Sequence, residues 1–396
     1  MNTNELSVRQ TAIQLRLAGE SIGAICHTLH KSEAWVRKWW RRYLQQGPDG
    51  LYELTRANHQ VANRTPAHIE QAVLGIRRRL AAHSTPHTRY SLIGAPQIRA
   101  ELEALGCTPL PAIRTIEHII ERAGLACPPL RLSPRIGHNS YPIPQAHDSN
   151  VLHQIDLVGP RYLTGDSTRY YFLVCKDVFD HAVYMEFAKS RQMDTILDFV
   201  IHAWQELGLP AQVQFDNGRE FCGFGKSARF LTRLIRACLR LGVEVIFIPP
   251  KKPHRNGSVE NFNGWFQPIL LKRPFRRPCD VRRELRSLIK TVNEQHVHAH
   301  LRGQTAAQYR RGKRLRKLPA HFTLDRSHLP LAVGKVTFIR LVSAEGTISV
   351  LGQLFRPGKR LKFHYVKATL YTKTQQLKVY HRGKLVKEFP YSLSKN

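Results

Sequence analysis

The sequence predicts a multidomain protein with an all-α N-terminal part, a central α/β part built on a mixed sheet, and a C-terminal all-β part. Three observations predict this fold class. Apolar residues recur at helical spacing through residues 1–126, strand and helix patterns alternate through residues 150–300, and period-two patterns return after residue 333. A chain of 396 residues is long enough for two or more domains.

The chain is strongly basic. It carries 61 Lys and Arg against 29 Asp and Glu, which gives a formal net charge of +32 at pH 7. A protein of this charge needs a polyanionic partner, and nucleic acid is the commonest one. Ribosomal proteins and general RNA-binding proteins share the same charge, so the charge alone does not name the class.

The sequence also bears on the compartment. Seven cysteines are scattered without any CxxC spacing, which argues against a zinc finger and against a disulfide framework. The first residues, MNTNELSVRQ, contain no apolar signal-peptide core, and no apolar run approaches the roughly 18 residues of a membrane span. We expect a reducing interior, and for a prokaryotic protein a cytoplasmic location held at the nucleoid through DNA.

Residues 1–54 are predicted to form a helix-turn-helix DNA-binding domain. Two short helical patterns precede a third, AWVRKWWRRYLQQ, for which Ser32 is a suitable N-cap. A short helix, a tight turn and a basic helix are the parts of this motif. The residues expected to contact DNA are Arg37, Lys38, Arg41 and Arg42.

Residues 55–126 repeat the order of three helices and suggest a second helix-turn-helix domain, with a weaker basic face on its last helix. The alternative is a purely structural helical bundle. Residues 127–149 are rich in Pro and basic residues, which is typical of an extended, semi-rigid linker.

Residues 150–300 alternate strands with helices, which predicts a mixed sheet covered by helices on both faces. The strands are expected at residues 151–157, 169–177, 181–187, 211–216 and 243–250, and the helices at 193–207, 227–241, 258–271 and 279–293.

The remaining chain is predicted to contain an exposed basic connector at residues 301–325 and a small β-barrel at residues 326–392. The Lys and Arg residues of 272–290 and 310–317 are expected to contact the DNA backbone or else to form a solvated face.

Three acidic residues stand in contexts that suit chemistry. Asp156 lies in the strand HQIDL, Asp216 ends a strand and opens FDNGREF, and Glu260 lies at the start of a helix in RNGSVENFNGWF. In this strand order we expect the first and fourth strands to be neighbours, so that the two aspartates can face one point and Glu260 can reach it from the helix. Three convergent carboxylates suit a hard cation such as Mg²⁺. Each carboxylate taken singly is more often a turn or cap residue.

With these motifs in this order, the chain resembles insertion-sequence transposases that share the catalytic core of retroviral integrases, with a ribonuclease-H-like fold. The matching segments are HQIDLVGP, FDNGREF, PPKKPHRNGSVENFNGWF and NEQHVHAHLRGQTAAQYR. The resemblance implies that Asp156, Asp216 and Glu260 are the catalytic, metal-binding acidic triad. The 43 residues between the last two exceed the family's usual gap, and we expect the surplus in residues 222–241.

The resemblance further implies a Mg²⁺-dependent transposase. It would bind the terminal inverted repeats of a mobile element, hydrolyse phosphodiester bonds and join the 3′-hydroxyl ends to target double-stranded DNA. Two Mg²⁺ ions are expected, with Mn²⁺ able to substitute, and the protein is expected to form a homo-oligomer on DNA. Two alternatives are a domesticated, non-catalytic DNA-binding regulator and a plain ribonuclease-H-type nuclease.

Two further groups of residues have open interpretations. His254, Arg255 and Asn256 precede Glu260 and either contact DNA near the site or belong to a solvated loop. His296, His298 and His300 look like a metal cluster, but no Cys or carboxylate pattern accompanies them, so we do not expect them to bind metal.

Overall fold

The computed structural model describes residues 3–53, 65–126, 141–222, 230–250, 253–327 and 329–393. The chain divides into two compact units, Met1–Arg64 and Thr65–Asn396. Residues 65–126, expected above as part of an independent domain, therefore belong to the same unit as the sheet. No helix in the described ranges is long and apolar enough to cross a membrane.

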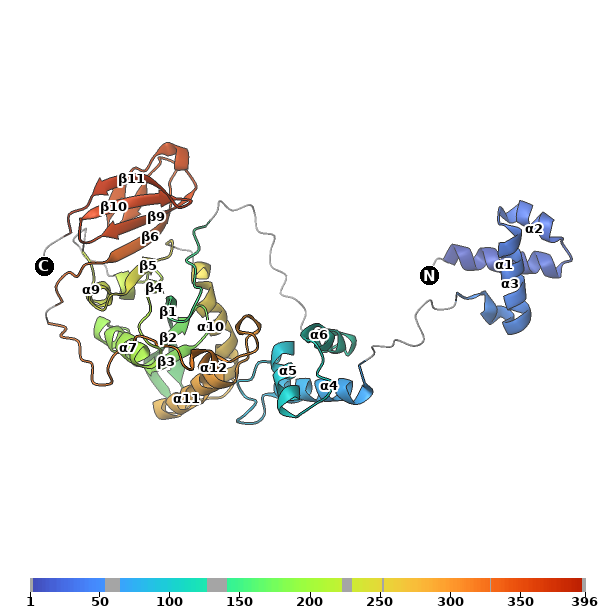
Figure 1. The fold of residues 1–396 in the computed structure, drawn as a ribbon, viewed down its shortest axis with the longest axis horizontal. Helices are drawn as coiled ribbons and strands as arrows, with labels where there is room; N and C mark the ends of the chain where they lie inside the picture. Colours follow the sequence, from blue (N-terminus) through green and yellow to red (C-terminus); the bar gives the residue numbers. More distant parts are fainter. Residues whose placement is uncertain are drawn as a thin grey trace. The chain divides into compact units, whose positions relative to one another are not determined.

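The first unit contains α1 (Thr3–Leu17), α2 (Ile22–Leu29), α3 (Glu33–Gln46) and the 3-10 helix η1 (Gly47–Leu51) (Figure 1). Ser32 caps α3, as predicted, by accepting a hydrogen bond of 3.3 Å from the backbone N–H of Trp35. Ile25 and Trp39 are almost fully buried between the helices. Such a small unit relies on these few apolar side chains for its stability.

The second unit begins with α4 (Ala67–Ala82), α5 (Ala95–Ala104) and α6 (Ile113–Arg122), which share a core of Val, Ile and Leu side chains. These helices are tied to the rest of the unit by polar contacts. Arg89 forms an ion pair of 2.7 Å with Glu284, and the Tyr90 hydroxyl donates to the same carboxylate at 2.8 Å. Both contacts explain why this segment does not separate as a domain of its own.

A nine-stranded sheet dominates the second unit, with strand order β11-β10-β9-β6-β5-β4-β1-β2-β3. The pairs β1–β4, β4–β5 and β5–β6 are parallel and the other pairs are antiparallel, so the sheet is mixed as predicted. The strands of this sheet are β1 (Leu152–Leu163), β2 (Asp166–Asp177), β3 (Val183–Ala188), β4 (Gln212–Phe215), β5 (Glu244–Phe247), β6 (Lys335–Leu341), β9 (Tyr365–Tyr371), β10 (Gln376–His381) and β11 (Lys384–Pro390).

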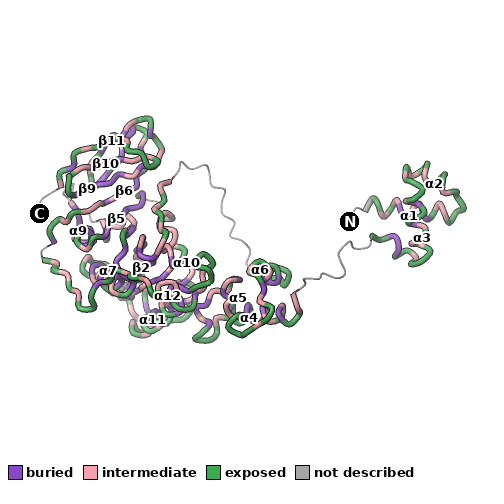
Figure 2. Tube along the Cα trace, in the orientation of Figure 1, coloured by how far each residue is buried: buried purple, intermediate pink, exposed green. Residues whose placement is uncertain are grey.

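Helices cover both faces of the sheet around β1, of which the first four residues are buried. Buried residues also gather along the neighbouring strands β2, β5 and β6 (Figure 2). One face packs on α7 (Met193–Glu206) and α9 (Arg233–Arg240), and the other on α10 (Gly257–Leu270) and α11 (Pro278–Gln295). Alternate side chains of a strand point to opposite faces. In β1, Ile155 therefore packs with the α7 side, and its neighbours face α10. The short helices are α8 (Arg219–Cys222), η2 (Pro253–Asn256), η3 (Ala299–Leu301), α12 (Ala306–Arg310) and η4 (Lys359–Leu361).

The predicted small β-barrel at residues 326–392 is not a separate closed module. Its strand β6 pairs with β5 in parallel, so the C-terminal strands extend the central sheet, and the strand order is open. The strands β7 (Ile348–Val350) and β8 (Gln353–Phe355) form a separate hairpin. The rings of Phe247 and Phe338 stack with centroids 5.3 Å apart, so the two regions share one hydrophobic core.

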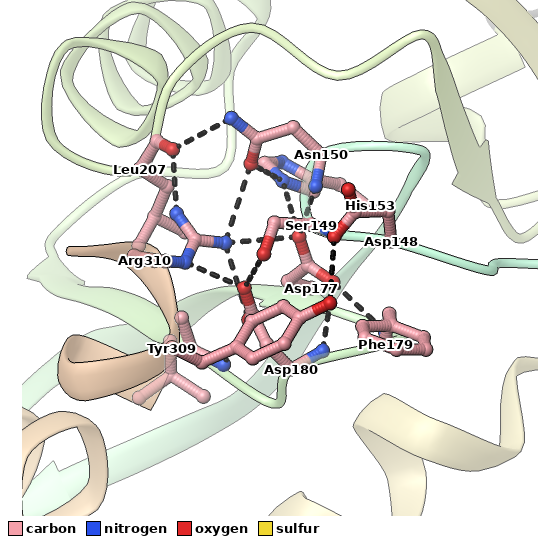
Figure 3. A network of polar contacts seen from close by, with 12 residues as sticks. Asp148, Ser149, Asn150, His153, Asp177, Phe179, Asp180, Leu207, Tyr309 and Arg310 are labelled. Carbon is pink, nitrogen blue, oxygen red and sulfur yellow. Dashed lines mark hydrogen bonds and ion pairs between the residues drawn. The ribbon is translucent and has the colours of Figure 1, made fainter. Parts of the chain in front are cut away.

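The connector expected to be exposed also contributes to the fold. Arg310 is only 13% exposed and forms ion pairs with Asp177 at 2.9 Å and Asp180 at 2.6 Å (Figure 3). Lys313 pairs with Asp148 in the same region. An Arg that neutralises two fully buried carboxylates has no freedom to contact DNA, so the expected backbone contact at this residue is wrong.

Candidate active site

The register of two parallel strands brings the two aspartates together. In the pairing of β1 with β4, Leu152 lies opposite Gln212 and Gln154 opposite Gln214. Two residues further along, the same register places Asp156 opposite Asp216. Asp156 within β1 and Asp216 directly after β4 thus lie near one another, on the face that α10 covers. The expectation that the first and fourth strands are neighbours is confirmed.

Side-chain amides fasten the start of α10 onto these two strands. The Gln154 amide oxygen accepts from the backbone N–H of Val259 at 3.1 Å. The Asn256 side chain donates to the Ile155 carbonyl at 3.3 Å and accepts from the Gln214 amide at 3.1 Å. Because Glu260 lies in the first turn of α10, these contacts hold it over the sheet beside the aspartates.

The aspartates are held by nearby hydrogen-bond donors. Asp156 accepts from its neighbour's N–H, that of Leu157, at 2.9 Å and from the Asn263 amide at 2.7 Å. Asp216 accepts from the Gly218 N–H at 2.8 Å. A Cβ at Gly218 would lie 2.9 Å from that carboxylate oxygen, so the glycine permits the close approach of backbone to carboxylate.

All three carboxyl groups are harder to ionise than free ones. Burial raises the pKa of Asp156 to about 6, and the charges of Asp216 and Glu260 add to this effect, while its hydrogen bonds oppose it. Burial is also the main cause that raises the pKa of Asp216 and of Glu260, and the charge of Asp216 adds to it at Glu260. At Asp216 the charge of Glu220 adds to the effect of burial, so carboxylates repel one another across a partly buried space.

The donor set fits a hard divalent cation. Carboxylate oxygens are the ligands that Mg²⁺ prefers, and within the described part of the chain no Arg or Lys forms an ion pair with any of the three. Their oxygens do not reach ligand spacing in this structure, since the one compact group of three metal-binding side chains among the described residues lies elsewhere.

The C-terminal region contributes to the site through Arg340 of β6. Its guanidinium donates to the Asn217 side chain at 3.1 Å and to the Ile248 carbonyl at 3.2 Å, and it is only 9% exposed. It thereby holds the turn that follows Asp216. Arg340 was not predicted as part of the site, because its strand pattern was interpreted as part of a separate barrel.

The three residues expected to contact DNA just before Glu260 differ in their exposure and contacts. Asn256 is 2% exposed with both ends of its amide bonded internally, so the expected DNA contact is wrong for this residue. Arg255 is half-buried with its guanidinium 4.1 Å from the centre of the Tyr141 ring. The side chain of His254 lies outside the described residues.

The four basic residues of α3 that are expected to bind DNA also differ in their exposure. Arg37, Lys38 and Arg41 are exposed. Arg42 is half-buried and donates to the Tyr52 carbonyl at 2.6 Å. Three side chains are therefore presented to solvent, and the fourth fixes the end of the unit.

The histidines do not form the cluster that the sequence suggested. His296 is buried and its Nε2 lies 2.6 Å from the Tyr90 carbonyl, away from any ligand role. His298 and His300 instead meet His181, from a distant part of the sequence, as one compact group. Sequence reasoning found two of its three members and missed the third, because the contact joins residues more than a hundred positions apart.

Comparison with known proteins gives one family and several solved structures. Residues 3–52 match the homeodomain-like domain family, which confirms the predicted helix-turn-helix at the N-terminus. The chain is similar to a simian T-cell lymphotropic virus intasome solved in complex with PP2A regulatory subunit B56 gamma. The identity is 19%, over 74% of this chain and 93% of that one, with a TM-score of 0.38.

Two integrase catalytic core domains are also similar. The HTLV-2 core, solved in complex with magnesium, is 21% identical over 42% of this chain and 99% of that chain, with a TM-score of 0.33. The BIV core is 16% identical over 41% of this chain and 94% of that chain, with a TM-score of 0.31.

Proposed function

We propose that this protein is a transposase that cuts and joins DNA, with Asp156, Asp216 and Glu260 as its catalytic acids. The observation that carries the proposal is the grouping of these three carboxyl groups, each with a raised pKa, on one face of the sheet beneath the start of α10. Half-buried acids without basic partners are costly to maintain, and such groups are typical of functional sites.

The carboxylates would hold two Mg²⁺ ions, which Mn²⁺ can replace, and the ions would supply Lewis acidity toward a phosphodiester. The chain's own residues set the geometry. Asn263 and the Leu157 N–H orient Asp156, the Gly218 N–H orients Asp216, and the amides on β1 and β4 place Glu260. Acids that are already held in position lower the entropic cost of orienting the reacting groups.

The reaction that we propose is substitution at phosphorus. In the first step water attacks the phosphodiester and the 3′-oxygen leaves, which frees a 3′-hydroxyl at the end of the element. In the second step that hydroxyl attacks a phosphodiester of target DNA, and one bond forms for each bond broken. No external energy source and no covalent bond to the protein are needed.

The partners follow from the rest of the chain. The homeodomain-like unit, with Arg37, Lys38 and Arg41 exposed, would recognise the terminal inverted repeats, and the charge of +32 would hold flanking and target DNA. Since one site serves one end at a time, we propose a homo-oligomer assembled on double-stranded DNA.

The test uses a supercoiled plasmid that carries the gene with its natural flanking DNA, incubated with purified protein in Mg²⁺. Asp156→Asn, Asp216→Asn and Glu260→Gln should each lower cleavage at the flanking repeats at least about a hundredfold, because each removes a ligand from one catalytic unit. Binding to the ends, measured by footprinting, should remain. EDTA should abolish cleavage by the wild type.

Asp194→Asn is the matched control, because Asp194 is an exposed carboxylate at the start of α7. It should cleave like the wild type. Cleavage that survives in Asp216→Asn would refute the assignment of the acids. A wild-type protein that binds the ends and never cuts them would instead favour a regulatory DNA-binding role.

A further inference from the structure

Three histidines from two distant segments meet beside the carboxyl end of β2. His181 follows the turn that ends β2 and precedes β3, while His298 and His300 lie just beyond α11. The latter segment closes on itself, since the N–H of His298 donates to the Gln304 carbonyl at 3.1 Å. The proposed catalytic acids make no use of this group.

The three rings are close enough to share one ligand. One donor atom from each ring lies within 4.8 Å of the corresponding atoms of the other two. The ring centroids of His181 and His298 are 4.7 Å apart, and that of His300 lies 5.0 Å from His181. A tetrahedral zinc ion with bonds of about 2.0–2.1 Å needs nitrogens roughly 3.3 Å apart, which small rotations of the rings would reach.

The nitrogens of these rings lack the hydrogen bonds that buried polar atoms normally have. Within the described structure, Nδ1 of His181 and Nε2 of His298 are buried without a hydrogen-bond partner. Such orphaned atoms are rare in native proteins and point to a missing partner. His300 differs, since its Nε2 bonds the Phe179 carbonyl at 2.7 Å. A carbonyl only accepts, so Nε2 carries the proton and Nδ1 keeps its lone pair.

The rings are also in the form that binds metal. Burial lowers the pKa of His181 to about 3 and that of His298 to about 4, with neighbouring Lys176 and the other histidines adding to the effect. These surroundings therefore disfavour the charged form of both rings. The neighbouring Asp177 partly offsets the charge of Lys176 at His181.

A polar network holds the turn that precedes His181 (Figure 3). Asp177 accepts from the N–H groups of Phe179 at 2.8 Å and Asp180 at 3.2 Å, and Arg310 bridges the two carboxylates. The turn therefore has little freedom. His181 itself has a φ of 65°, a left-handed conformation that a non-glycine residue adopts only when its surroundings impose it.

We propose that His181, His298 and His300 form a structural binding site for a transition-metal ion of the Zn²⁺ class. Three imidazoles suit Zn²⁺, Co²⁺, Ni²⁺ or Cu²⁺, whereas Mg²⁺ prefers oxygen ligands. The exposed side, at His300, leaves the fourth position to water. The bound ion would tie the β2–β3 turn to the segment after α11. This site is independent of the proposed DNA chemistry, so either proposal can fail without the other.

The experiment titrates full-length, tag-free, chelator-treated protein with Co²⁺ and with Zn²⁺. One equivalent of Co²⁺ should give the visible absorption bands of a tetrahedral site, Zn²⁺ should displace it, and saturating Zn²⁺ should raise Tm by about 3–5 °C. His300→Gln removes an exposed ligand, and His181→Asn keeps a residue that tolerates the left-handed conformation. Each should weaken binding by at least about tenfold and remove the rise in Tm.

His381→Gln is the matched control, because its ring lies 5.2 Å from that of His364 in a pair of histidines outside the proposed site. This variant should bind Co²⁺ and Zn²⁺ like the wild type. The proposal is wrong if the wild type binds neither ion, or if His300→Gln and His181→Asn bind as tightly as the wild type. Folding of each variant is checked by circular dichroism. Because His300 is exposed, His300→Gln should fold normally, so a loss of metal binding in this variant reports on the site itself.

Discussion

At the scale of single residues, the candidate site depends on glutamine side chains that lie two positions before each aspartate. Gln154 stands two positions before Asp156, and Gln214 stands two positions before Asp216, so the pattern Gln-x-Asp occurs in both strands. Period two places each Gln and Asp on one face, where the glutamines bind the start of α10 and the aspartates face Glu260. The sequence motifs alone singled out the three acids, and their catalytic role stays a prediction. The repeated Gln-x-Asp pattern was a further indication in the sequence that these two glutamines belong to the site.

Asn263 was harder to predict, because its role depends on the position of α10 over β1. It follows Glu260 by three positions, which places both residues on one face of the helix. Its amide donates to Asp156 at 2.7 Å. Nothing in the local sequence distinguishes it from Asn261, which is exposed. Only the packing of helix on strand makes the distinction.

The raised pKa of Asp156 has a consequence for stability against pH. A carboxyl group whose pKa is raised on folding destabilises the native state as pH rises from its unfolded value near 4 to its folded value of about 6. Asp156→Asn removes this effect. The stability of the variant relative to the wild type should therefore increase between pH 4 and pH 7, as measured by Tm in the absence of divalent ions.

Asp166 provides the control for this prediction. Hydrogen bonds from Thr168 lower its pKa, with a further contribution from Tyr170, so Asp166→Asn should lose stability relative to the wild type as pH rises from acid values. If the advantage of Asp156→Asn does not change with pH, the raised pKa of that residue is wrong.

At the scale of elements, the sequence predicted most strands and helices but not every partner. The first five strands and the helices between them agree with the predicted order, because each has its own local pattern. The pairing of β5 with β6 joins segments about ninety residues apart, and no local pattern encodes it. The period-two patterns after residue 333 were read correctly as strands and wrongly as a separate barrel.

Arg340 gives this pairing a measurable role. Arg340→Met should lower the free energy of unfolding by about 2–4 kcal/mol, because it leaves buried oxygens of Asn217, Ile248 and Ser349 without their donor. Urea denaturation measures the change. Cleavage should also need more Mg²⁺ for half-maximal rate, since the turn beside Asp216 is loosened.

Arg360→Met is the control at this scale, because Arg360 is exposed on η4. It should leave both the stability and the Mg²⁺ requirement unchanged. A fully stable Arg340→Met protein would show that the guanidinium does not hold the sheet edge beside the site.

At the scale of the whole molecule, the chain contains two compact units, each with its own apolar core. A protein lacking residues 1–64 should therefore remain folded by circular dichroism. It should no longer give footprints at the ends of the mobile DNA element. It should still bind any DNA in a salt-sensitive way, because the remaining chain is still basic. End-specific footprints from the shortened protein would place recognition in residues 65–126 or beyond.

The two units also allow a test of the proposed oligomer. Full-length Asp156→Asn supplies end recognition without chemistry, and active protein lacking residues 1–64 supplies chemistry without recognition. A mixture should join paired ends, whereas neither protein should do so alone. Joining of both ends by a complex that mass photometry shows to contain one protein chain would rule the oligomer out.

The position of β6 in the sheet has a consequence for synthesis. The middle strand of the nine, β5, has β4 on one side and β6 on the other, and β6 begins only at Lys335. A ribosome adds about 5–20 residues each second, so β6 is made several seconds after β5. Until then, the edge of β5 that pairs with β6 has no partner strand. During that time Asn217 also lacks Arg340. A nascent or prematurely terminated chain would thus carry all three acids in an incompletely supported site, and DNA cutting would begin only once the last strands had been made.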